Sequence, residues 1–166
     1  MTERLREAVR ALVIDADDNV LLVRLIFDRA SLPEGFWVCP GGGVEPGETH
    51  AQALRRELAE EVGVELESLG PLLWRKRTIF DIGDYDGQLD HVYLQRFTGA
   101  HTRGSAGRPT LASSARAAEG LVEVRWFSPD ELSCSTDVFA PRTLPQLMRH
   151  VVEHGPPEQP WELTGF

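Results

Sequence analysis

Cysteine is scarce in this chain of 166 residues, and long apolar runs are missing from it. The two cysteines, Cys39 and Cys134, are too few for a disulfide framework or a cysteine metal cluster. We interpret Cys39, which follows the apolar residues 36–38, as a small buried apolar residue. The apolar runs have the length of strands and fall well short of the roughly 18 residues that a membrane-spanning helix needs. The first residues lack the apolar stretch of a secretory signal, so we expect a cytoplasmic protein that does not bind membranes.

Positive charge is also in deficit, since 17 Lys and Arg residues against 26 Asp and Glu residues give a formal net charge of −9. This balance argues against binding to nucleic acid, which relies on lysine and arginine side chains that contact phosphates. It leaves room for a small phosphorylated substrate, because a bound divalent cation can reverse the local field. The length fits one domain. We expect a single domain over residues 1–154, followed by a proline-rich C-terminal tail over residues 155–166 that lies along the surface.

Segments rich in Val, Ile and Leu predict strands at residues 7–15 and 20–27. The turn-forming residues 16–19 lie between these strands and should join them into a hairpin. A further short strand is predicted to end at Pro40. Three more strands are predicted at residues 72–80, 90–97 and 121–127.

A helix is predicted from His50 to Val62, because Thr49 and Gln52 have the spacing of a capping box and Gly63 suits the position after the last turn. A short helix should begin after Ser128, which proline follows. Residues 142–152 predict a last amphipathic helix.

Two glycine-containing stretches stand apart from these elements. Residues 41–43 are three consecutive glycines, which we do not expect to form a regular element. Residues 99–120 are rich in Gly, Ala, Ser, Thr and Arg and are long for a connection. We expect the second stretch to be a mobile lid or partly disordered, with residues 101–117 near the mouth of a substrate site.

Three carboxylates gather on one side of the predicted helix. At about 100° per residue, Glu57, Glu60 and Glu61 share a face, and beside it runs an apolar stripe of Ala51, Leu54, Leu58 and Val62. Like charges at these spacings destabilise a helix, and a single guanidinium, that of Arg56, cannot balance three acids. Clustered hard oxygen ligands suit Mg²⁺ or Mn²⁺, and the glycines nearby let the backbone approach a phosphate or a metal. A solvated acidic face is the alternative interpretation.

The spacing of these residues decides between the two interpretations. The chain has Gly42, five residues, Glu48, seven residues, and then the run Arg-Glu-Leu-Ala-Glu-Glu-Val-Gly-Val at 56–64. This run matches every position of the Nudix box, and a chance match is on the order of one in a million or rarer. The chain resembles the Nudix hydrolases over roughly residues 7–135, with further similarity at residues 36–42 and 121–132.

The resemblance implies an α/β fold, an α/β/α sandwich around a mixed sheet. It also implies a hydrolase that uses Mg²⁺ or Mn²⁺ to cleave a phosphoanhydride bond in a nucleoside diphosphate derivative, such as a nucleoside triphosphate or a nucleotide sugar. Family members are often dimers, so a homodimer is an open expectation. Two other functions stay open: a non-catalytic nucleotide-binding sensor on the same fold, and a diphosphate isomerase, because Cys39 lies near the glycine run.

The resemblance also assigns roles to single residues. The groups that match the family's metal ligands are Glu57, Glu60, Glu61 and the carbonyl of Gly41 or Gly42. Arg56 matches the arginine that orients the glutamates, and Glu48 matches a supporting acid at the start of the helix. One of the glutamates or a nearby acid would position or deprotonate water. Many members add a carboxylate from outside the box, for which Glu119 is the first candidate and Glu123 the second, although either is as readily a plain exposed glutamate.

The substrate is less well determined by the sequence. Trp37, Trp74, Phe80 and Tyr85 either stack on a base or belong to the core. Some subfamilies carry a proline or tyrosine about 16–18 residues past the box, a window that holds Phe80 and Asp81 in this chain.

Overall fold

The computed structural model describes residues 2–27, 31–97 and 120–166. Its centre is a mixed sheet, whose strands in chain order are β1 (Leu5–Ile14), β2 (Val20–Leu25), β3 (Phe36–Val38), β4 (Gly41–Gly43), β5 (Leu72–Ile82), β6 (Tyr85–Arg96), β7 (Leu121–Phe127), β8 (Phe139–Ala140) and β9 (Trp161–Thr164). The strands lie in the order β8-β3-β2-β1-β6-β5-β9, with β4 paired to β1 and β7 paired to β2. The predicted hairpin is confirmed, since β1 and β2 pair antiparallel through Val13 and Leu21.

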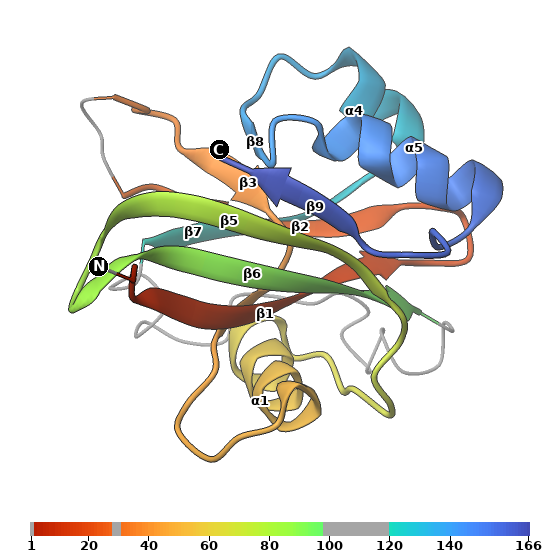
Figure 1. Cartoon of the computed structure of the whole chain (residues 1–166). Helices are drawn as coiled ribbons and strands as arrows, with labels where there is room; N and C mark the ends of the chain where they lie inside the picture. Colours follow the sequence, from red (N-terminus) through yellow and green to blue (C-terminus); the bar gives the residue numbers. More distant parts are fainter. Residues whose placement is uncertain (1, 28–30, 98–119) are drawn as a thin grey trace.

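Helices cover both faces of this sheet. The helix α1 (His50–Val62) lies on one face, and α4 (Pro129–Cys134) and α5 (Leu144–His154) lie on the other (Figure 1). Because side chains alternate along a strand, β1 contributes to two cores. Val9 and Val13 pack in the core under α1, whereas Leu12 and Ile14 pack in the core under α5. The predicted α/β/α sandwich is confirmed.

The bounds predicted for α1 are also confirmed. The Thr49 side chain accepts a hydrogen bond from the Gln52 backbone, and the Thr49 N–H donates to Gln52 Oε1 over 2.9 Å. Gly63 ends the helix with φ 67°, a left-handed conformation that glycine adopts without strain. Both signals lie in the local sequence, so the helix begins and ends where the sequence predicts.

The glycine run is where the prediction is wrong, because residues 41–43 form the strand β4. This strand pairs antiparallel with β1, with Gly42 opposite Val9. A Cβ on Gly41 would lie 2.1 Å from the Val9 carbonyl oxygen, and Gly41 has φ 147°. The absence of side chains therefore does not prevent pairing here; it allows the backbone to approach β1 closely.

Other elements differ from the predicted bounds. The strand β6 begins at Tyr85 instead of residue 90, α5 begins at Leu144 instead of residue 142, and the strand β8 was not predicted. Within residues 155–166, β9 joins the sheet as a parallel neighbour of β5, with Trp161 opposite Trp74. The stretch 101–117, predicted to be mobile, lies outside the described residues. None of the helices in the described ranges has the length and apolar character needed to cross a membrane.

Candidate active site

Two carboxylates of the box are buried between α1 and β4. Glu57 is 8% exposed and Glu61 is 2% exposed. A Cβ on Gly42 would lie 2.6 Å from Glu57 Oε1, so the bare backbone of β4 lies directly against this carboxylate. The Gly41 N–H donates to Glu61 Oε2 over 3.4 Å. Glu60 lies at the outer edge of the group, with its side chain 49% exposed.

Arg56 connects these acids. Its guanidinium donates from Nε and Nη2 to the two carboxylate oxygens of Glu48, over 2.9 and 2.7 Å, and from Nη1 to Glu57 Oε1 over 2.8 Å. Nη2 also donates to the Gly43 carbonyl over 3.0 Å, and Glu60 lies 3.7 Å from Nη1. The hydrogen bonds that Arg56 donates to Glu48 lower the pKa of Glu48 to about 2 and raise the pKa of Arg56. This bidentate geometry fixes the guanidinium, and through it the position of Glu57.

Glu57 and Glu61 line a cleft of about 280 Å³, which Arg6 and Arg10 of β1 also line. Arg10 is almost buried and forms an ion pair with Asp90 over 2.8 Å. Burial opposes the charge of Arg10, but the ion pair with Asp90 outweighs it, so the pKa of Arg10 lies above its ordinary value. Carboxylates and guanidinium groups therefore meet in one cleft, as an ion and an anionic substrate together require.

A larger cavity of about 570 Å³ adjoins the cleft, and both are lined by Arg10, Leu25 and Phe27. Lys76, Gln88 and Asp90 are among the polar side chains that line it. Its aromatic side chains are those of Phe27, Phe36, Phe80 and Phe166. Gln88 donates to Asp90 Oδ1 over 2.8 Å, and Lys76 lies 4.0 Å from Asp90. Burial lowers the pKa of Lys76, although Asp90 opposes that shift.

The sequence alone does not predict this polar group. Its residues lie on strands in which polar and apolar side chains alternate, and this alternation alone indicates a polar face exposed to solvent. One signal of a buried charge is present in the sequence. Arg10 lies in an apolar run, between Val9 and Ala11. A charged side chain in an apolar run calls for a buried partner.

The remaining candidates from the sequence lie in different places. Glu119 is outside the described residues. Glu123 forms an ion pair with Arg24 over 3.1 Å and lines a separate cavity, so the structure does not bring it to the cleft. Cys39 is buried as expected, and burial raises the pKa of its thiol to about 12, which disfavours an acid–base role near pH 7.

The aromatic candidates divide between core and surface. Trp37 and Trp74 are buried and belong to the core under α5. Phe80 and Tyr85 are exposed. Phe80 lines the larger cavity, and Tyr85 lines a polar pocket beside Glu60.

The donor set at the cleft fits a hard divalent cation. Carboxylate oxygens from Glu57, Glu61 and Glu60 are the ligands that Mg²⁺ and Mn²⁺ prefer. Gly42 offers a backbone free of a side chain on the same side, and a Cβ there would occupy the space against Glu57. Arg56 forms ion pairs with both Glu48 and Glu57, so one guanidinium serves several of these carboxylates, and a divalent cation would add positive charge beside them.

A sequence profile of the NUDIX domain matches residues 4–154. The chain belongs to the Nudix family. The nucleoside triphosphatase NudI of Enterobacter sp. (strain 638) is 39% identical over 83 residues, which cover 49% of this chain and 58% of that protein. NudI of Salmonella typhimurium is also 39% identical over 83 residues, with the same coverage. This Nudix chain therefore aligns with little more than half the length of these curated relatives.

Solved Nudix structures share the fold over nearly the whole chain. The MutT protein from Methanosarcina mazei Go1 superposes with a TM-score of 0.63 at 18% identity and covers 92% of this chain and 96% of its own. The NUDIX domain of Shewanella oneidensis NrtR, solved with ADP ribose, gives a TM-score of 0.64 at 17% identity, with coverage of 92% and 90%. At these identities the likeness concerns the fold alone.

Proposed function

We propose that this Nudix protein is a hydrolase that uses Mg²⁺ or Mn²⁺ to cleave a phosphoanhydride bond in a nucleoside diphosphate derivative. The observation that carries the proposal is the burial of Glu57 and Glu61 against the side-chain-free strand β4. The NudI relatives, named as nucleoside triphosphatases, make a nucleoside triphosphate the first substrate to test.

The residues of the cleft would have different roles in such a reaction. A bound dication would polarise phosphoryl oxygens and acidify an attacking water, and Glu57, Glu60 and Glu61 would hold it. Arg56 positions Glu57 through the 2.8 Å hydrogen bond and itself rests on Glu48. Arg6 and Arg10 line the same cleft as Glu57 and Glu61 and would supply positive charge for phosphate oxygens.

The adjoining cavity is the place that we assign to the nucleoside. Small-molecule sites are mostly apolar with a few polar groups that fix orientation. This cavity has four phenylalanines and the polar group of Lys76, Gln88 and Asp90. Because Arg10 lines both spaces, a ligand can extend from the cavity into the cleft, with its base in the first and its phosphates in the second.

The test is a panel of nucleoside triphosphates and nucleotide sugars, each incubated with Mg²⁺ or Mn²⁺ and analysed for phosphate, pyrophosphate and mononucleotide. We expect release of a mononucleotide from at least one substrate, and loss of that activity with a chelator and in Glu57→Gln. Binding of a nucleotide without any turnover would favour the sensor function instead. A cytoplasmic location and a homodimer stay predictions, for cell fractionation and for light scattering of the purified chain.

A further inference from the structure

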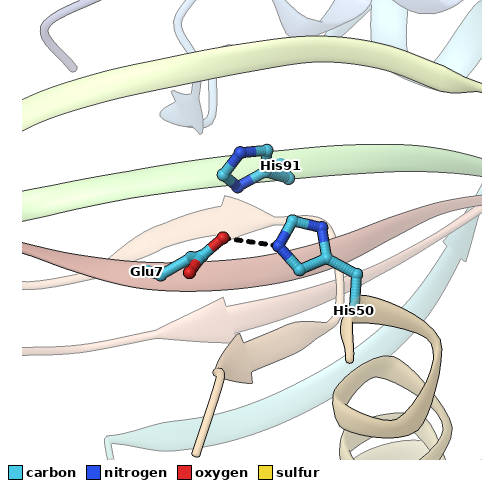
Figure 2. A group of neighbouring side chains, drawn as sticks. All are labelled: Glu7, His50 and His91. Atoms are coloured by element: carbon cyan, nitrogen blue, oxygen red, sulfur yellow. Dashed lines mark hydrogen bonds and ion pairs between the residues drawn. The ribbon is translucent and has the colours of Figure 1, made fainter. Parts of the chain in front are cut away.

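A second group of potential metal ligands lies beside α1 and includes none of the glutamates of the box. Within residues 2–27, 31–97 and 120–166, Glu7, His50 and His91 form the one group of three such side chains whose ligand atoms all lie within 4.8 Å of one another. They come from β1, the start of α1 and β6, and their polar ends point toward one another (Figure 2). We propose that Glu7, His50 and His91 bind one divalent transition-metal ion of the Zn²⁺, Co²⁺ or Ni²⁺ class.

The donor chemistry distinguishes this group from the box. Two imidazoles and one carboxylate suit Zn²⁺ and its neighbours in the first transition series, whereas an all-carboxylate set suits Mg²⁺ and Mn²⁺. Three protein ligands leave a fourth position open to water or to a ligand. Glu7 has a half-exposed side chain, so an ion can reach the group from solvent.

The distances require only a small adjustment. Ligand atoms around a tetrahedral ion with bonds of about 2.1 Å lie roughly 3.4 Å apart. His50 Nε2 and Glu7 Oε1 are now 2.5 Å apart in a hydrogen bond, so they must separate by roughly 1 Å. Rotation of the exposed Glu7 side chain can provide this movement. The hydrogen bond between His50 and Glu7 would then be replaced by one bond from each residue to the metal.

The surroundings orient both histidines as metal ligands are usually oriented, through a hydrogen bond on the second ring nitrogen. His50 Nδ1 lies 2.6 Å from the Tyr93 hydroxyl, which can donate or accept and so supports either tautomer. His91 Nδ1 lies 3.4 Å from the Ala8 carbonyl oxygen. The rings of His50 and His91 lie close, with centroids 4.5 Å apart. Burial and the neighbouring His50 lower the pKa of His91.

The backbone that carries the group is well fixed. β1 and β6 pair in parallel, with Val9 opposite His91, and the capping box at Thr49 holds the residue next to His50. A positive ion at the first turn of a helix opposes the helix dipole, and the Glu7 carboxylate offsets that cost. A bound ion would tie the start of α1 to β1 and β6, and so stabilise the helix that carries Glu57 and Glu61.

An experiment must distinguish this metal site from two other possible metal sites. Glu7 also lines the polar pocket that Glu57 and Glu60 border, so the two metal sites would be neighbours. His150 and His154, with ring centroids 4.8 Å apart on α5, form a histidine pair that can also take up Zn²⁺. The measurement therefore uses the full chain without a histidine tag, with excess Mg²⁺ to occupy the box.

The experiment titrates Zn²⁺ into the metal-stripped protein by calorimetry and repeats thermal melts with and without Zn²⁺. We expect wild type to bind one equivalent with a raised Tm, and Glu7→Gln and His91→Gln to bind at least about tenfold more weakly. The controls His154→Gln and the double variant Glu57→Gln/Glu61→Gln should keep this binding. Melts of each variant without Zn²⁺ report whether it is folded, and the exposed Glu7 keeps the test valid if His91→Gln unfolds.

A second measurement uses Co²⁺, whose visible absorption is stronger with imidazole ligands in a four- or five-coordinate site than in an octahedral oxygen site. We expect a visible band in wild type that His91→Gln loses. Wild-type Zn²⁺ affinity in both Glu7→Gln and His91→Gln would overturn the proposal, as would loss of binding only in a control. None of these readouts depends on turnover, so failure here is distinct from failure of the proposed hydrolase.

Discussion

A single methyl group on β4 should disable the cleft without unfolding the protein. Gly42→Ala adds a Cβ that would lie 2.6 Å from Glu57 Oε1 and 2.6 Å from its Cδ. Gly42 is outside the left-handed region of φ, unlike Gly41, so alanine fits its backbone. The nearest obstacle is the end of a flexible side chain, and the Glu57 carboxylate will move instead of the strand.

The size of the effect follows from this distance. Non-bonded carbon atoms reach their best separation at about 3.5 Å, so the carboxylate must retreat by roughly 0.9 Å. A misplacement of about 1 Å in an active site can lower turnover by roughly 100-fold, or about 2.7 kcal/mol in the barrier. Stability should change little, because replacing a strand glycine by alanine gains about 0.5–1 kcal/mol, whereas moving Glu57 weakens its hydrogen bond with Arg56.

A double-mutant cycle with Glu57→Gln tests the cause. We expect kcat/KM to fall in each single variant and Gly42→Ala to add little in the Glu57→Gln background, because both changes act on one carboxylate. Urea denaturation of all four proteins checks that the fold is retained. Wild-type turnover in Gly42→Ala, or losses that simply add in the double variant, would refute the placement of Glu57 against β4.

Three further changes probe the same residues. Glu61→Gln should lose most of its turnover, and in melts with and without Mn²⁺ the metal-induced rise in Tm should shrink, because an amide is a poor ligand for a hard dication. Arg56→Lys should lower kcat by about 10–100-fold, since an ammonium cannot replace the bidentate contact with Glu48 or reach Glu57 as well. Glu48 has its pKa lowered from 4.5 to about 2, so its stabilising effect is complete above pH 4.5 and is lost as pH falls toward 2. The difference in unfolding free energy between wild type and Glu48→Gln should be constant at neutral pH and shrink over that acidic interval.

The helix α1 could be predicted to the residue because its signals are local. The cap at Thr49, the glycine at 63 and the apolar spacing between them all lie within one short segment. The same holds for the carboxylates of the box, whose spacing places Glu57 and Glu61 one turn apart. What spacing does not determine is which acid is buried: Glu61 is buried and its neighbour Glu60 is exposed, because the packing of α1 on β4 sets that difference.

The elements that could not be predicted depend on distant partners. β4 is a strand because β1 lies beside it, and three glycines have no strand preference of their own. β9 follows a proline-rich segment and becomes a strand through its pairing with β5. Such pairing is a property of the folded sheet and leaves no periodic pattern in a segment of three or four residues.

The positive charge in the cleft could not be predicted from the overall composition either. A net charge of −9 argues against binding to nucleic acid, yet four cationic side chains, those of Arg6, Arg10, Lys76 and Arg77, line the cleft and the cavity beside it. Two of them, Arg10 and Lys76, are held near Asp90, since a charge in the interior of a sheet needs a partner. Their positions depend on the pairing of β1 with β6 and of β6 with β5. Because local charge at close range outweighs the distant, screened charge of the surface, we expect an acidic protein to bind an anionic substrate at this cleft.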